Sequence, residues 1–192
     1  DEGQQTIQTT YDMNLQRLSP NELEVLLLMS LLRPERITEQ LLASLAPSII
    51  DTEDREEKGK RTLRPWDKLK EKEREKYNLL ISGLTRYSLI AVGTELTLQG
   101  TIASMHRILQ LVLLEKYSEY NSQMTVVVIE RLSRLFGFKE IQLQRLQSSA
   151  ITQTTTCLPH IKCAIEHAET STEQPLSVET LTRIARLLDK SG

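Results

Sequence analysis

The sequence lacks an excess of charge of either sign. Its 192 residues include 24 Lys and Arg against 26 Asp and Glu, a formal net charge of −2. Nucleic-acid-binding domains usually carry a clustered basic excess, so a large phosphate-binding surface is not expected, although local patches are left open. With 39% hydrophobic and 26% charged residues, the composition is that of a soluble globular protein with one ordinary domain or two small ones.

Long apolar runs and a targeting signal are also missing. No run approaches the roughly 20 apolar residues that span a bilayer, and the first ten residues, DEGQQTIQTT, are too acidic and polar for a secretory signal peptide. We therefore expect a cytoplasmic location and no membrane partner. Because the sequence begins in a polar stretch without Met, we interpret it as a piece of a longer protein.

The motifs of nucleotide hydrolysis and of common hydrolases are absent. The only Gly-Lys pair, in EEKGKRT, has no glycine five residues earlier and is followed by Arg, so it does not match the phosphate-binding loop. The patterns G-x-S-x-G and H-E-x-x-H do not occur either. We predict no autonomous enzyme, no catalytic residue and no cofactor bound by this chain alone.

The pattern of the first 50 residues predicts two helices. Ser19, Pro20 and Glu22 form the N-cap, first-position proline and capping-box arrangement that begins a helix. The apolar run that follows predicts a buried helix that Pro34 stops. ITEQLLASLA predicts a second short helix, ending before Pro47.

A mixture of both charge signs fills residues 51–76. It predicts a solvated insertion over residues 51–64 and then an exposed first half of a helix beginning at Pro65. The helix becomes amphipathic toward Tyr87.

The stretch 87–117 predicts a β-hairpin that leads directly into a helix. YSLIAVGTELTLQGTIAS favours two short strands around Gly93-Thr94, and MHRILQLVLLEKY is typical of an amphipathic helix. Met105, His106 and Arg107 therefore fall where the hairpin ends and the helix begins. Backbone N–H groups of a first helical turn and an imidazole would converge there, which suits an anion. The alternative for His106 is a structural histidine at a helix start.

The order of elements predicts a mostly α protein. Three helices followed by a two-stranded wing is the order of a winged helix, assigned to residues 1–120. Residues 121–192 favour an α-helical bundle connector, with a helix ending at Phe136-Gly137 and a last helix capped by Ser177.

Cys157, His160, Cys163 and His167 are spaced by 3, 3 and 4 residues, as in a possible metal site. On one helix they would spread over about 15 Å of axis, too far for a single tetrahedral zinc. Pro159 is expected in the first turn, leaving Cys157 outside the helix and a bent arrangement open. We predict no metal site, and whether the four include a metal-binding pair is left open. A Cys157–Cys163 disulfide is not expected, because six helical residues rise about 9 Å.

Three segments carry a resemblance to a known family: LQRLSPNELEVLLLMSLLRPERITEQLL, MHRILQLVLLEKYSE and LPHIKCAIEHAE. With the YSLI hairpin between them, they resemble the region after the nucleotide-binding core of STAND signal-transduction NTPases of NB-ARC type. Fungal and bacterial members with tetratricopeptide repeats are the most similar. In that family a winged-helix domain precedes a helical connector that leads into the repeats, and the resemblance covers roughly the whole chain. The insertion 51–64 exceeds what the family has.

The resemblance implies a role for the hairpin–helix junction. Met105-His106-Arg107 resembles the M-H-D motif, which reads H-R in many tetratricopeptide members, whereas plant members have aspartate in place of Arg107. It implies that His106 contacts the β-phosphate of ADP on a neighbouring nucleotide-binding domain and holds the inactive state closed. ADP or ATP would then be bound by the parent protein.

We therefore expect a non-catalytic regulatory segment of a multidomain NTPase switch. Its partners would be the upstream nucleotide-binding domain and the downstream repeat domain of the same parent. A free winged-helix module that places the 65–86 helix in the major groove of nucleic acid is one alternative, disfavoured by the mixed charges of that helix. A protein-binding helical scaffold is the other.

Overall fold

The structure, a computed structural model, describes residues 2–46, 71–95, 100–143 and 148–171, with positions 182 and 185. The insertion 51–64, the predicted start at Pro65 and the N-cap at Ser177 lie outside the described residues. The described part is mostly helical and contains one three-stranded antiparallel sheet.

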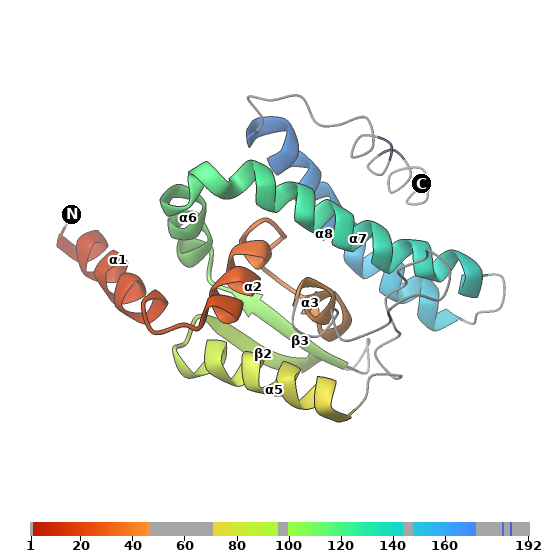
Figure 1. The fold of residues 1–192 in the computed structure, drawn as a ribbon, viewed down its shortest axis with the longest axis horizontal. Helices are drawn as coiled ribbons and strands as arrows, with labels where there is room; N and C mark the ends of the chain where they lie inside the picture. The colour runs from red at the N-terminus through yellow and green to blue at the C-terminus, as the bar shows by residue number, and fades with distance from the viewer. Residues whose placement is uncertain are drawn as a thin grey trace.

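In Figure 1 the sheet, α2 and α3 lie between α5 on one side and the pair α7 and α8 on the other. The elements in chain order are α1 (Glu2–Leu15), α2 (Pro20–Ser30), β1 (Ile37–Thr38), α3 (Glu39–Leu45), α5 (Glu71–Arg86), β2 (Ile90–Glu95), β3 (Gly100–Met105), α6 (Arg107–Lys116), the 3-10 turn η2 (Ser118–Tyr120), α7 (Asn121–Leu143) and α8 (Ser148–Ser171).

The capping box predicted at the start of α2 is confirmed. The N–H of Glu22 donates to Ser19 Oγ at 3.4 Å, and the N–H of Ser19 donates to Glu22 Oε2 at 2.7 Å. The second predicted helix is also confirmed as α3, where the Thr38 hydroxyl caps the first turn by accepting from the N–H of Leu41 at 3.3 Å. These hydrogen bonds satisfy N–H groups that have no partner inside the helix.

The sheet differs from the prediction in two ways. Its order is β1-β3-β2, so the predicted hairpin carries a third strand, and Ile37 of β1 pairs with Ala103 of β3. The predicted turn at Gly93-Thr94 is wrong, because both residues belong to β2 and pair with Ile102 and Thr101. The strand pairing therefore runs past the glycine as far as Glu95, which pairs with Gly100.

The helical half beyond residue 120 shares its core with the N-terminal half. One continuous cluster of buried side chains includes Leu26 and Leu28 of α2, Leu132 of α7 and Ile161 of α8. Arg131 of α7 also donates hydrogen bonds to the Leu45 carbonyl at the end of α3 and to the Glu24 carboxylate on α2. The predicted connector is thus packed against the predicted winged-helix region.

Three further helical features depart from the predictions. The segment Glu2–Leu15, for which no element was predicted from the sequence, forms α1. The predicted helix end at Phe136-Gly137 is wrong, because α7 continues to Leu143. Pro159 lies inside α8 and not in its first turn, so Cys157 is within the helix. Helices α7 and α8 pack against each other. This tertiary contact outweighs the low helix propensity of glycine and proline.

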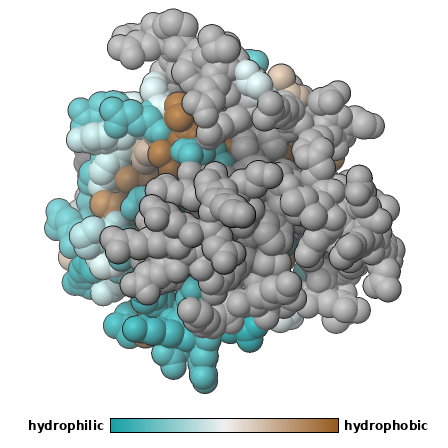
Figure 2. Space-filling view, turned by 45° about the vertical axis from the view of Figure 1, so that its right-hand side comes forward, coloured by the Kyte–Doolittle hydropathy of each residue, from teal (hydrophilic) through white to brown (hydrophobic). Residues whose placement is uncertain are grey.

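On the face drawn in Figure 2, most described residues are hydrophilic, and hydrophobic residues gather in one band. Among the large apolar side chains of the described part, Leu79 on α5 and Leu111 on α6 are 72% and 64% exposed. Searched over the described residues, no helix combines the length and the hydropathy needed to cross a membrane.

Candidate functional site

The junction between β3 and α6 is where the sequence predicted it. Met105 ends β3, His106 is the N-cap residue with extended backbone angles (φ −70°, ψ 133°), and Arg107 begins α6. Met105 is buried, and its N–H donates to the Pro34 carbonyl at 2.7 Å. The junction is thereby fixed to the segment 33–36, which connects α2 to β1.

His106 is exposed and caps α6 through its own side chain. Its Nδ1 accepts from the N–H of Ile108 at 3.2 Å, so one of the first-turn N–H groups already has a partner. Because Nδ1 accepts, the neutral ring carries its proton on Nε2. The imidazole therefore offers an N–H donor to the outside, and fewer backbone N–H groups remain for an anion than the sequence suggested.

Arg107 is exposed and forms an ion pair back toward the α2–β1 segment. Its Nη2 lies 3.3 Å from Glu35 Oε1, with side-chain exposures of 72% and 51%. Exposed pairs of this kind contribute little to folding because water screens them. The guanidinium is therefore held in place loosely and stays accessible.

The segment 33–36 is also contacted from the far side, by α8. Nε2 of His160 lies 3.3 Å from the carbonyl oxygen of Arg36, a residue with a left-handed φ of 58°. Arg36 itself is paired through its guanidinium with Glu95 at the end of β2, with Nε 3.1 Å from Oε2. One short segment thus connects the β3–α6 junction, strand β2 and α8.

The His160 ring is 1% exposed, and burial lowers its pKa to about 4. The backbone carbonyls of Arg36 and Arg33 raise that pKa in part, and the charge of Arg33 lowers it further. The ring is therefore neutral at pH 7 and donates from Nε2 to the Arg36 carbonyl. Its Nδ1 is buried and has no hydrogen-bond partner within the described part of the chain.

The four candidate metal ligands all lie on α8. Cys157 and His160 are buried, Cys163 and His167 are partly exposed, and both cysteines are free thiols. Burial raises the pKa of the Cys163 thiol and lowers the pKa of His167. In the described ranges, no group of three or more His, Cys, Asp or Glu side chains is placed to hold a metal ion.

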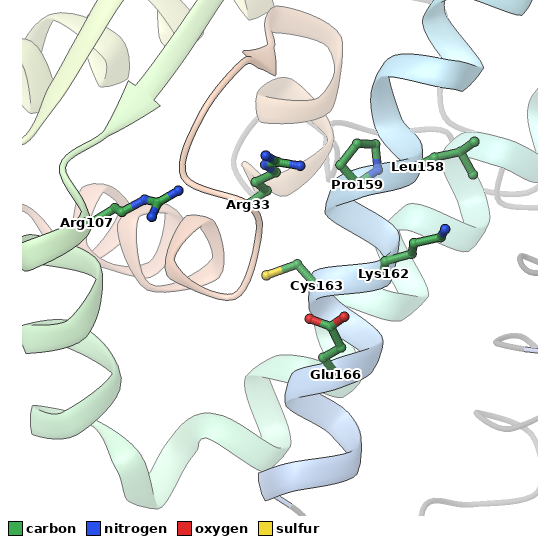
Figure 3. Close-up of a pocket in the computed structure, with 7 residues that line it drawn as sticks. All are labelled: Arg33, Arg107, Leu158, Pro159, Lys162, Cys163 and Glu166. Atoms are coloured by element: carbon green, nitrogen blue, oxygen red, sulfur yellow. The ribbon is translucent and has the colours of Figure 1, made fainter.

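A cavity of about 610 Å³ opens beside the junction, between α8, the start of α6 and the α2–β1 segment. Its lining, drawn in Figure 3, consists of Arg33, Arg107, Leu158, Pro159, Lys162, Cys163 and Glu166. Only Arg107 and Cys163 were named as candidate site residues from the sequence. No local pattern marks Arg33, Lys162 or Glu166, because they become neighbours only when α8 packs against the α2–β1 segment.

Comparison with protein families finds one match. Residues 13–122, more than half of the chain, match a family described as "Domain of unknown function (DUF7779)". The matched part begins in α1, contains the sheet and the β3–α6 junction, and stops at the start of α7. No curated protein and no solved structure matches the chain.

Proposed function

The chain belongs to the DUF7779 family, whose function is unknown, and we propose that it is the non-catalytic regulatory segment of a multidomain NTPase switch. It holds the ADP-bound inactive state of its parent protein through contact with an adjacent nucleotide-binding domain. The observation that carries this proposal is the geometry of His106, which is exposed at the start of α6 with Nδ1 already accepting from Ile108. The remaining Nε2–H is a suitable donor for a phosphate oxygen of ADP.

A winged-helix assignment supports the proposal. Helices α2, α3 and α5 precede the β2–β3 hairpin, and the short β1 lies beside β3 in the sheet. In the winged-helix assignment, α7 and α8 are the helical connector toward a downstream repeat domain. A cytoplasmic location, where ADP and ATP are abundant, is part of the proposal.

Exposed apolar side chains next to His106 favour a protein partner at this surface. Ile108 and Leu111, three residues apart on α6, are 42% and 64% exposed and lie on one side of the helix. Apolar side chains around a polar contact are the usual composition of the buried centre of a protein interface. We assign this partner as the upstream nucleotide-binding domain.

The expected size of the effect follows from a two-state switch. A contact made only in the closed state shifts the closed–open equilibrium by its own free energy, typically about 1 to 3 kcal/mol. His106 and the helix N-terminus both favour an anion at this point. Losing the ADP contact therefore raises the ratio of open to closed protein by about five- to 150-fold.

The test uses the full natural protein, purified as wild type and as His106→Asp, His106→Asn and Arg86→Ala. Asp and Asn both cap a helix well, so these variants keep α6 intact while removing the imidazole, and Asp adds a charge that repels phosphate. Arg86, exposed at the end of α5, is the matched control. After denaturation, the nucleotide carried through purification is quantified by chromatography.

We expect ADP with the wild type and with Arg86→Ala, reduced ADP with His106→Asn, and little or none with His106→Asp. Equal ADP in all four proteins, or none in the wild type, would exclude the ADP contact. In that case the protein-binding scaffold becomes the better function, because the apolar pair on α6 does not depend on a nucleotide.

A different measurement distinguishes nucleic-acid binding from the proposed regulatory function. The first described turns of α5 expose Glu71 and Glu75 as well as Lys72 and Arg74, a mixed surface that does not favour a phosphate backbone. A duplex-DNA gel shift that weakens steeply between 50 and 200 mM salt would favour the nucleic-acid function. We expect no shift.

A further inference from the structure

The cavity beside α8 has the size of a small-molecule site. Its volume of about 610 Å³ falls within the roughly 300 to 1,000 Å³ typical of ligand pockets. Its walls come from three separate parts of the chain, namely the α2–β1 segment, the start of α6 and one side of α8. Leu158 and Pro159 supply an apolar wall.

The charge of the lining is strongly one-sided. Arg33, Arg107 and Lys162 are cationic, and Glu166 is the only carboxylate among the lining residues. Cys163 adds no negative charge, because burial raises the pKa of its thiol. The charge of Glu166 also raises the pKa of that thiol, and the charge of Arg33 lowers it.

Arg33 is available to a ligand. Its side chain is exposed, and no carboxylate pairs with it in the described part of the chain. In Figure 3 Arg107 extends toward α8 and the Cys163 thiol points back toward the α2–β1 segment, whereas Lys162 extends away. The two guanidinium groups are therefore the cations best placed to act together, although Arg107 is also paired with Glu35 outside the lining.

We propose that this cavity binds a small organic molecule through a doubly charged anionic group, either a phosphate or a pair of carboxylates, held by Arg33 and Arg107. The planar guanidinium group donates parallel N–H bonds that match either oxyanion. Leu158 and Pro159 contact the organic part of the ligand, and the Glu166 carboxylate limits the number of negative charges that the cavity accepts. The site is distinct from the proposed ADP contact, because His106 does not line the cavity.

The experiment is isothermal titration calorimetry on the 192-residue chain with phenyl phosphate and phthalate as probes. Inorganic phosphate is the probe without an apolar part, and sodium chloride keeps the ionic strength constant. We expect saturable binding of at least one organic probe, and weaker binding of inorganic phosphate than of phenyl phosphate. A preference for phenyl phosphate assigns a phosphate ligand, and a preference for phthalate assigns a carboxylate.

Variants of the chain test whether the probes bind in this cavity. Arg33→Gln should weaken binding about tenfold, the usual effect of losing one charge-assisted hydrogen bond, while the control Arg86→Gln leaves it unchanged. Glu166→Gln should tighten binding about threefold, because one repulsive charge a few ångströms away is removed. Circular dichroism verifies that each variant is folded.

Three outcomes would overturn the proposal. They are no saturable binding of either organic probe, equal losses in Arg33→Gln and Arg86→Gln, and loss of probe binding in His106→Asp, which would place the anion at the helix start. The cavity proposal and the ADP-contact proposal can be tested independently of each other. Arg33→Gln should keep ADP in the full natural protein, and His106→Asp should keep the probe in this chain.

Discussion

His160 contacts the short segment between α2 and β1 directly, and Met105, the neighbour of His106, contacts the same segment, yet the surroundings of the two histidines are opposite. His106 follows Met105, whose N–H donates to the Pro34 carbonyl at 2.7 Å, and its ring is exposed. The His160 ring is 1% exposed, with Nε2 3.3 Å from the Arg36 carbonyl. The His106 ring is thus accessible to a partner, whereas the His160 ring contacts the α2–β1 segment and helps to hold α8 against it. Burial, and not residue type, separates the accessible histidine from the structural one.

The largest expected effect is on stability, from His160→Ala. The change removes a buried ring, opens a cavity between α8 and the α2–β1 segment, and leaves the Arg36 carbonyl without this donor. We expect a loss of about 3 kcal/mol in the free energy of unfolding. Urea unfolding followed by circular dichroism measures it.

The matched control is His106→Ala, which should cost several times less. If both variants lose the same stability, the contrast between the two histidines is wrong. His160→Gln, which keeps an N–H donor near the Arg36 carbonyl, should recover part of the loss.

A second test of the buried histidine is the pH dependence of stability. The pKa of His160 is lowered from 6.5 to about 4 in the folded protein, so the unfolded chain binds the proton more tightly. Its stabilisation is complete above pH 6.5 and is lost as the pH falls toward 4. At pH 5 the loss relative to pH 7.5 is about 2 kcal/mol.

The pH effect is isolated by comparison with His160→Gln, because other groups also titrate. Burial raises the pKa of Glu39, which acts in the opposite direction as the pH falls. The difference between wild type and variant should therefore narrow by about 2 kcal/mol between pH 7.5 and 5. A constant difference would mean that His160 is not buried as a neutral ring.

Features encoded by neighbouring residues could be predicted from the sequence. The Ser19–Glu22 capping box and the position of His106 at a helix start both depend on contacts within three residues. These local hydrogen bonds have strong residue preferences. The same reasoning fails at Gly93, because the pairing of β2 with β3 decides where the strand ends.

Features that depend on distant contacts could not be predicted. β1 has only two residues, Ile37 and Thr38, and is a strand because β3 lies beside it. Pro159 is inside α8 although proline favours a first turn. The cavity forms only where α8 lies beside the α2–β1 segment that carries Arg33, and nothing in the local sequence predicts that contact.

A smaller effect on the free energy of unfolding is expected when the helix cap at His106 is removed. His106→Ala loses the acceptor for the N–H of Ile108 and should lower the free energy of unfolding by about 0.5 kcal/mol. His106→Asp should lose nothing, because aspartate caps well and its charge favours a helix N-terminus. Thermal unfolding of the two variants side by side measures the difference. A larger loss in His106→Asp would mean that the ring itself packs against the fold.

The smallest expected effect on stability is at the Arg107–Glu35 pair, the exposed link from the junction to the α2–β1 segment. Both side chains are more than half exposed, so Glu35→Gln should change the free energy of unfolding by less than about 0.5 kcal/mol. The same change releases Arg107, which lines the cavity, and should tighten phenyl phosphate binding about twofold by removing a nearby negative charge. Calorimetry at 50 mM and 500 mM salt distinguishes the causes, because the gain should shrink when the charges are screened. A gain that persists at high salt would mean that Glu35 restricts access to the cavity sterically, and a loss of stability above 1 kcal/mol would mean that the pair holds the junction in place.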